Sequence, residues 1–163
     1  PTEAGLYRDG DAAWRYLTET RGYAPDRVVV MGRSLGGAVS IELLTRVDAA
    51  GLVLISTLRS ARAIARSMGL GLLAPFVGTR LDSESRIPTL TAPLLIFHGE
   101  DDEIVPVDHG RTLYELAHDP KRLELVPAAR HNDIIEVAGP AFWGPLGDFL
   151  DRVAPPTRSA VSP

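Results

Sequence analysis

The stretch VVVMGRSLGGA at residues 28–38 carries the strongest structural signal in the chain. Three β-branched valines are typical of a strand, and a helix-like run over 38–46 follows the glycines. A strand, a sharp turn and a helix in this order make Gly32-x-Ser34-x-Gly36 a nucleophile elbow, a turn that exposes the serine hydroxyl. Both glycines of this motif are expected because bulky side chains would clash in so tight a turn, and the next glycine extends the small patch.

Short apolar segments alternate with helix-like segments along the rest of the chain. Apolar runs that lack polar alternation are typical of strands buried on both faces, as in a parallel sheet. The predicted strands are 27–31, 51–55, 94–97 and 123–126, and the predicted helices are 9–20, 38–46, 108–118 and 142–153. Strands that alternate with helices favour an α/β fold, in which helices flank a parallel sheet and connect its strands by right-handed crossovers.

We expect one domain over 1–154, with a small helical cap insertion at about 58–87 and a disordered tail over 155–163. The valines at 28–30 make both faces of their strand apolar, so this strand belongs inside a sheet, and its upstream neighbours are expected before Pro1. We therefore expect the chain to be the carboxy-terminal part of a domain whose amino-terminal strands are missing. By itself such a piece is expected to be poorly soluble, because one edge of that strand is unpaired, and nearly inactive, because one of the two oxyanion donors is missing with the upstream segment.

The composition excludes several classes of protein. The net charge is −4 over 163 residues, so no general attraction to nucleic acid is expected. The chain has no cysteine, which excludes disulfides and thiolate metal sites. No run approaches the length of a membrane span, and the start shows no signal-peptide pattern. We expect a cytoplasmic protein, with an upstream targeting or anchor segment left open because the chain begins with Pro1.

Side chains that can serve as nucleophile, acid and base each follow a predicted strand. Ser34 follows the first strand, the acidic group at 100–103 follows the third, and His131 follows the fourth. The carboxyl ends of parallel strands meet at one edge of a sheet, so these residues are expected to converge there. A serine hydroxyl needs a base to take its proton, and the base needs an acid to hold its tautomer. The backbone N–H of Leu35, the residue after the serine, is the expected oxyanion donor.

Four histidines compete for the role of base. His98 lies at the end of a strand and is expected to be structural, turning the loop that follows it. His109 lies near the start of a predicted helix, where the helix dipole disfavours a protonated imidazole, and His118 lies near the end of that helix. His131 lies in a short polar loop before the final helical region, and it is our choice.

The segments GRSLGGA at 32–38, HGEDDEIVP at 98–106 and HND at 131–133 together resemble the α/β-hydrolase superfamily. Within it, the likeness is to the ABHD13/Bem46-like serine hydrolases, which are grouped with the S33 serine-aminopeptidase-like domains. The second segment is similar to the superfamily pattern H-G-x-x-D-x-x-V-P, which puts the acid at Asp102 rather than at Asp101. The resemblance extends from about residue 5 to about residue 153.

This resemblance implies that a Ser-Asp-His triad hydrolyses an ester, thioester or amide bond of a small acyl substrate through an acyl-enzyme, without cofactor or metal. Two other classes of function stay open. Acyl transfer uses the same triad with an alcohol or amine in place of water, and analysis of the products separates it from hydrolysis. A non-catalytic binding module with the same fold has no need to keep all three side chains.

Arg59, Arg62 and Arg66 are spaced i, i+3 and i+7, so they are expected on one face of a helix. The simpler interpretation of this spacing is a solvated helix face. The alternative is a basic rim that orients anionic substrates or lipid headgroups at a membrane surface near the mouth of the site.

Overall fold

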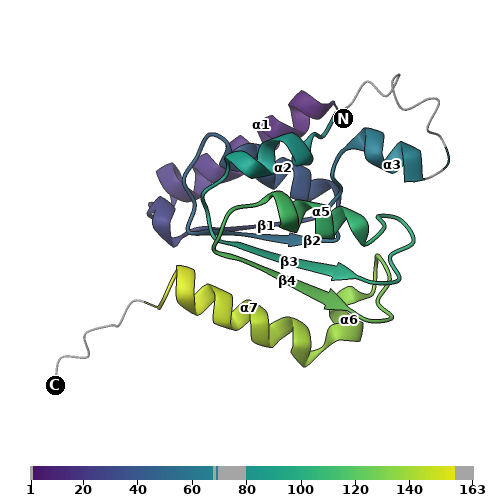
Figure 1. The fold of residues 1–163 in the computed structure, drawn as a ribbon. Coiled ribbons are helices and arrows are strands. Elements are labelled where there is room, and N and C mark those ends of the chain that lie inside the picture. Colours follow the sequence, from purple (N-terminus) through teal and green to yellow (C-terminus); the bar gives the residue numbers. More distant parts are fainter. Residues whose placement is uncertain (1, 68, 70–79, 157–163) are drawn as a thin grey trace.

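A computed structural model describes residues 2–67, 69 and 80–156 of the chain (Figure 1). Within these ranges four parallel strands form one sheet in the order β1-β2-β3-β4. The strands are β1 Val29–Arg33, β2 Gly51–Ile55, β3 Leu94–Gly99 and β4 Lys121–Val126. The α/β class and all four predicted strands are confirmed, although β1 lies two residues later than expected, β3 ends two residues later and β4 begins two residues earlier.

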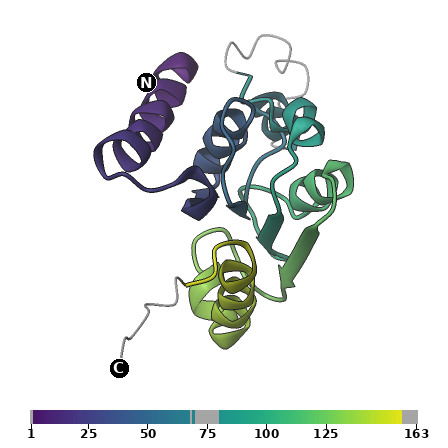
Figure 2. The same ribbon diagram turned by 90° about the vertical axis from the view of Figure 1, so that its left-hand side faces the viewer.

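Helices cover both faces of the sheet (Figures 1 and 2). One layer contains α1 Glu3–Arg15, α2 Leu35–Leu44 and α5 Asp108–Leu116, and the opposite layer contains α6 Ile134–Ala138 and α7 Pro140–Val153. The shorter elements are η1 Tyr16–Thr20, η2 Pro25–Arg27, α3 Ala61–Ser67, α4 Ser83–Arg86 and η4 Ile87–Thr89. The molecule is therefore a three-layer sandwich in which β2 and β3 are shielded on both faces.

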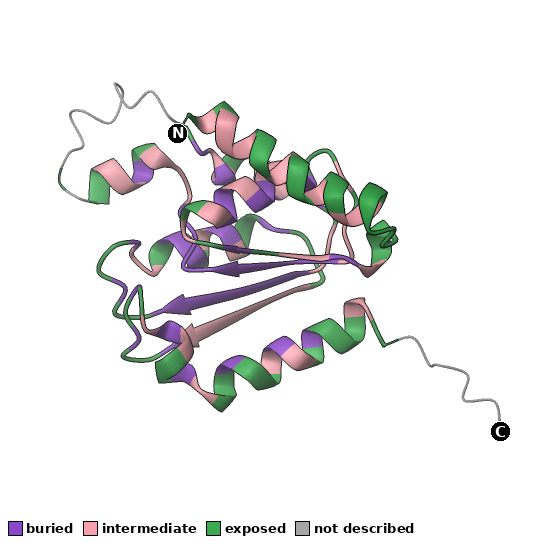
Figure 3. Ribbon diagram, turned by 180° about the vertical axis from the view of Figure 1, so that it is seen from behind, coloured by how far each residue is buried: buried purple, intermediate pink, exposed green. Residues whose placement is uncertain are grey.

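Two apolar clusters lie on the two faces of the sheet, and they explain why the central strands lack polar alternation. Leu52 and Leu54 of β2 belong to the cluster under α2 and α5, whereas Val53 and Ile55 belong to the cluster under α7. Successive side chains of a strand point to opposite faces, so a strand covered on both sides must be apolar at every position. The buried colouring of β2 and β3 follows this rule (Figure 3).

Helix α1 begins at Glu3 rather than at Asp9, so the predicted start of the first helix was wrong. Thr2 caps it, because its hydroxyl accepts the N–H of Gly5 at 3.1 Å. Glu3 then joins the helix to a distant segment, since its carboxylate accepts the backbone N–H groups of Arg80 at 2.7 Å and Leu81 at 3.1 Å. This long-range contact is not encoded in the local pattern that predicted the helix.

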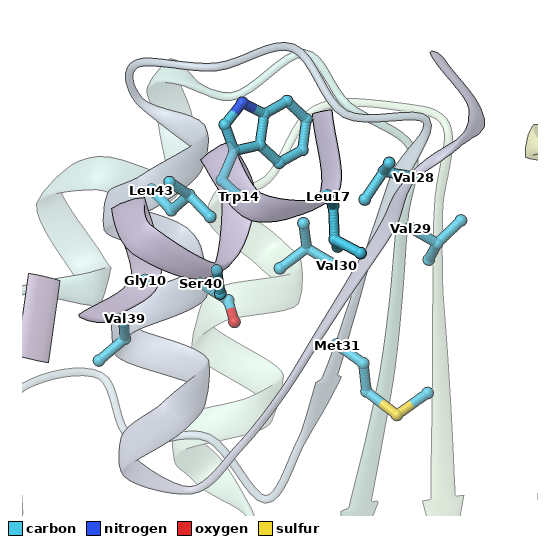
Figure 4. A pocket seen from close by; sticks show the side chains of 11 residues that line it. Gly10, Trp14, Leu17, Val28, Val29, Val30, Met31, Val39, Ser40 and Leu43 are labelled. Carbon is cyan, nitrogen blue, oxygen red and sulfur yellow. The ribbon is translucent and has the colours of Figure 1, made fainter. Parts of the chain in front are cut away.

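Strand β1 lies at the edge of the described sheet and is less buried than its apolar sequence predicts. Its Val29 and Val30 are half-buried, and Met31 is 49% exposed. A cavity of about 280 Å³ lies between β1, α1 and α2 (Figure 4). Trp14 of α1 and Leu17 of η1 are among the apolar side chains that line it. The face of β1 near α1 is therefore covered only loosely.

The cap insertion expected at about 58–87 falls partly on residues 68 and 70–79, which lie outside the described residues. Its described part contains α3, which begins at Ala61, and α4. Residues 157–163 of the expected tail also lie outside the described part of the chain.

The glycines around the serine differ in how tightly they are enclosed. A Cβ added at Gly32 would lie 2.6 Å from the carbonyl oxygen of Gly36, and a Cβ added at Gly37 would overlap the side chain of Thr57. A Cβ added at Gly36, in contrast, would meet nothing within 4 Å. The steric requirement expected for Gly36 was therefore wrong, whereas Gly32 and Gly37 do sit where a side chain would clash.

We expect Gly37→Ala to lower the free energy of unfolding by about 1–3 kcal/mol, because the added methyl group overpacks against buried Thr57. The matched variant Gly36→Ala should leave it unchanged or raise it by up to about 1 kcal/mol, because alanine favours a helix over glycine. Urea unfolding of both variants measures the difference. Equal destabilisation would contradict the enclosure described for the two glycines.

Candidate active site

Ser34 lies at a sharp turn between β1 and α2. Its φ of 51° and ψ of −120° are rare for a residue with a side chain, and such a conformation persists only where neighbours hold it. The N–H of Ser34 donates to the carbonyl oxygen of Ile55 at 2.8 Å, which fixes the turn to the end of β2. Because the chain reverses direction at this residue, the serine hydroxyl stands at the carboxyl edge of the sheet.

The structure brings Ser34, Asp102 and His131 together. Nε2 of His131 lies 3.1 Å from Oγ of Ser34, and Nδ1 of His131 lies 2.8 Å from Oδ2 and 3.1 Å from Oδ1 of Asp102. The imidazole ring and the carboxylate are buried, with Asp102 and His131 each 6% exposed. If Nδ1–H donates to the carboxylate, Nε2 is left as an acceptor for the serine hydroxyl proton.

The acidic group at 100–103 supplies Asp102, and not Asp101, to this arrangement. Oδ1 of Asp102 also accepts the backbone N–H groups of Ile104 at 3.0 Å and Val105 at 2.7 Å. The side chain of Asp101 is exposed, and its backbone N–H donates to Ala129 at 3.1 Å. The choice of Asp102 over Asp101 therefore agrees with the geometry, while its catalytic role stays a prediction.

Several donors stabilise the charge on Asp102. Burial acts to raise the pKa of this carboxyl, but hydrogen bonding by His98, His131 and the two backbone N–H groups lowers it well below its usual range. Nε2 of His98 lies 3.5 Å from Oδ2 of Asp102 and 2.8 Å from the carbonyl oxygen of Val105. His98 is fully buried, and these contacts help to hold the acid loop in place, which agrees with the structural role expected for this residue.

The remaining two histidines lie away from the serine. Nδ1 of His109 accepts the backbone N–H of Arg59 at 3.1 Å, and Nε2 of His118 lies 2.8 Å from the carbonyl oxygen of Pro88. Burial lowers the pKa of His109 to about 4, with the positive charge of Arg59 as a second cause. The ring of His109 is therefore neutral at physiological pH. Of the four histidines, His131 is the one within hydrogen-bonding distance of Ser34.

The expected oxyanion donor begins helix α2. Leu35 is the first residue of that helix, and the N–H groups of a first helical turn have no carbonyl partner within the helix. The positive end of the helix dipole points the same way, which favours an anion beside Ser34. The role of the Leu35 N–H stays a prediction.

The expected helix face with three arginines was wrong. Helix α3 begins at Ala61, so Arg59 precedes it. The guanidinium of Arg59 lies 3.8 Å from a carboxylate oxygen of Glu84 and donates to the hydroxyl of Thr112 at 3.3 Å. Of the three arginines, only Arg62 and Arg66 lie on α3, and both are exposed there, whereas these contacts hold Arg59 against neighbouring elements.

Sequence reasoning missed two residues of the site, Arg33 and Glu103. The guanidinium of Arg33 donates to the backbone carbonyl of His131, and the carboxylate of Glu103 accepts the backbone N–H of His131. Arg33 occupies a variable position of the elbow motif, and Glu103 belongs to a group of acids that could simply face solvent. The sequence offered one signal for them: Arg33 directly precedes Ser34, and Glu103 directly follows Asp102.

The described residues contain no helix long and apolar enough to cross a bilayer. In the same ranges, no three side chains of His, Cys, Asp or Glu gather in a way that could hold a metal ion.

The sequence matches known hydrolases. Residues 63–138 match the family model described as serine aminopeptidase, S33. Alpha/beta hydrolase domain-containing protein aho-3 of Caenorhabditis elegans is 32% identical over 168 residues, which cover 99% of this chain and 49% of that protein. The human alpha/beta hydrolase domain-containing protein 17B is 33% identical over 141 residues, or 82% of this chain and 46% of that protein. The chain belongs to the α/β-hydrolase superfamily. It spans about half the length of these curated relatives.

Solved structures of other α/β-hydrolases share the fold. The esterase domain of a Rhodothermus marinus protein superposes with a TM-score of 0.71 and 25% identity, over 91% of this chain and 69% of that one. An acylaminoacyl peptidase of Pyrococcus horikoshii gives a TM-score of 0.75 over 96% of this chain and 29% of that one. Its identity is 16%, so it supports the fold alone. The sequence matches therefore give a hydrolase family, and the superpositions give its fold.

The neutral ring of His109 predicts a stability that depends on pH. The ring has a pKa near 6.5 when unfolded and about 4 when folded, so protonation favours the unfolded state. The stabilisation is complete above pH 6.5 and is lost as the pH falls toward 4, by about 3 kcal/mol for this group. Urea unfolding at several pH values between 7 and 4 measures this slope.

The variant His109→Gln should flatten that slope, because glutamine keeps an acceptor for the Arg59 N–H without a titrating group. His118→Gln is the matched control, since its ring is exposed. An unchanged slope in His109→Gln would contradict the lowered pKa.

Proposed function

We propose that this chain carries the catalytic triad of a serine hydrolase that cleaves an ester, thioester or amide bond through an acyl-enzyme. The observation that carries the proposal is the continuous path from Ser34 through His131 to Asp102. Its two links are 3.1 Å from Oγ to Nε2 and 2.8 Å from Nδ1 to Oδ2. Both are hydrogen-bonding distances, and both join groups with the required donor and acceptor character.

In the acylation step, Oγ of Ser34 attacks the substrate carbonyl carbon and its proton passes to Nε2 of His131. The negative charge that develops on the carbonyl oxygen is stabilised by the N–H of Leu35. The bond to the leaving group then breaks, and the leaving group takes the proton from Nε2. Asp102 stabilises the positive imidazole ring that exists between these two transfers.

In the deacylation step, water attacks the acyl carbon and gives a proton to Nε2 of His131. The carboxylic acid product leaves as that proton returns to Oγ of Ser34. The same acyl-enzyme reacts with an alcohol or an amine if either replaces water, which is the alternative of acyl transfer. Analysis of the products formed from an activated ester, with and without an added alcohol, therefore distinguishes the two outcomes.

The nucleophile is tested by Ser34→Ala in the full-length protein that contains this chain. We expect loss of labelling by a fluorophosphonate probe and a fall in kcat of several orders of magnitude on acyl esters of graded chain length, because the attacking oxygen is removed. Ser40→Ala is the matched control, since Ser40 lies within α2, the helix that follows Ser34, and in the described ranges its hydroxyl donates to the carbonyl oxygen of Gly36 alone, at 3.0 Å. Normal esterase activity in Ser34→Ala would reject the proposal.

The acid is tested by comparing Asp102→Asn with Asp101→Asn. The first variant should lower kcat by about 10⁴-fold, because an amide at this position favours the wrong tautomer of the histidine. The second should leave kcat nearly unchanged, because the side chain of Asp101 is exposed. If the ranking of the two kcat values is reversed, the acid is Asp101.

A further inference from the structure

The backbone N–H and C=O of His131 are each bound by a charged side chain, Glu103 of the acid loop and Arg33 at the end of β1. Nη2 of Arg33 donates to the carbonyl oxygen of His131 at 2.8 Å and to Oδ1 of Asn132 at 2.8 Å. Oε2 of Glu103 accepts the N–H of His131 at 3.3 Å. Both polar groups of one residue's backbone are thus engaged by charged side chains that are distant in sequence.

The origin of these two side chains gives the contacts their meaning. Arg33 directly precedes Ser34, and Glu103 directly follows Asp102. The loop that presents the serine therefore also holds the backbone of the histidine, and so does the loop that presents the acid. A shift of either segment would therefore move His131, the residue whose ring must contact both Ser34 and Asp102.

The histidine loop needs such support because little regular structure holds it. It runs over 127–133 between the end of β4 and the start of α6, and Arg130 and Asn132 are exposed. Ala128 has a φ of 60°, which is an uncommon conformation for a residue with a side chain. Ala129 holds the start of the loop, because it is buried in the core and its carbonyl oxygen accepts the N–H of Asp101. The residues after it need support of their own, since proton transfer requires hydrogen-bonding distance between Nε2 and Oγ.

We propose that Arg33 and Glu103 are positioning residues that clamp the backbone of His131 so that its ring stays between Ser34 and Asp102. This inference rests on the proposed function, because the clamp acts on catalysis only through those three side chains. Charge strengthens both contacts relative to neutral hydrogen bonds. A misplacement of a catalytic group by about 1 Å can cost 100-fold in rate, so loss of the clamp is expected to be visible in kcat.

The clamp predicts a graded series at position 33 in the full-length protein. Arg33→Met removes the donors and should lower kcat by about 10-fold to 100-fold, with KM nearly unchanged. Arg33→Lys keeps a charged donor on a shorter side chain, so it should restore part of the lost kcat. If Arg33 acts in folding alone, Arg33→Met should instead lower the melting temperature and the amount of active protein. The kcat per active site, with the sites counted by titration with the fluorophosphonate probe, should then be unchanged.

Position 103 offers a matched pair of variants. Glu103→Gln keeps an acceptor oxygen and should retain most of the activity, whereas Glu103→Ala removes it and should lower kcat. Arg111→Gln is the control, because Arg111 lies 3.5 Å from a carboxylate oxygen of Glu100 in the same acidic group, and among the described residues no hydrogen bond or ion pair joins it to Arg33, Glu103 or His131. This control should leave kcat nearly unchanged.

Hydrogen exchange of the backbone amides in 129–133 tests the clamp without relying on activity. The exchange should be faster in Arg33→Met and in Glu103→Ala than in the wild type, because both variants free the backbone of His131. If the fluorophosphonate probe still labels Ser34, unchanged exchange together with unchanged kcat in both variants would overturn the clamp. A wild-type protein that neither labels nor hydrolyses would overturn the proposed function and the catalytic role of the clamp, and faster exchange in the variants would then identify a purely structural contact.

Discussion

The backbone conformation of Ser34 is the constraint on which the rest of the site depends. A positive φ at a residue with a side chain costs roughly 1–3 kcal/mol, so its surroundings must hold it in place. The bond from Ser34 N–H to Ile55 and the absence of side chains at Gly32 and Gly37 provide this hold. Strand β1 and helix α2 can then meet at one residue, which puts the half-buried Ser34 at the sheet edge with the first N–H groups of α2 beside it.

The register of the sheet brings the acid and histidine loops to the same edge. Arg33 pairs with Ile55 across β1 and β2, and Gly99 pairs with Val126 across β3 and β4, so the strands end at similar levels. The two loops then touch through their backbones, because a Cβ added at Gly99 would meet the backbone of Ala129. Asp102 and His131 approach each other because this glycine removes the side chain that would separate their loops.

The sequence predicted the features that depend on residue pattern and sheet topology. Its predictions were wrong or missing where contacts between distant segments determine the structure. The four strands and the convergence at the carboxyl edge follow from apolar runs and from the parallel connection rule. The early start of α1 depends on Thr2 as a cap, and Glu3 ties this start to distant backbone. The position of Arg59 outside α3 and the contacts of Arg33 with the histidine loop depend likewise on how separate segments meet.

The chemistry proposed for the site also depends on how the charge of Asp102 is stabilised. Its carboxylate is held by neutral backbone donors and by two imidazole rings, and among the described residues no lysine or arginine forms an ion pair with it. A permanent cation at this position would neutralise the carboxylate and weaken its field at His131. Without such a cation, the full negative charge remains available when His131 takes the serine proton. Arg33, the nearby cation that contacts the histidine loop, binds the carbonyl oxygen of His131 instead, so it can hold that loop without competing for the acid.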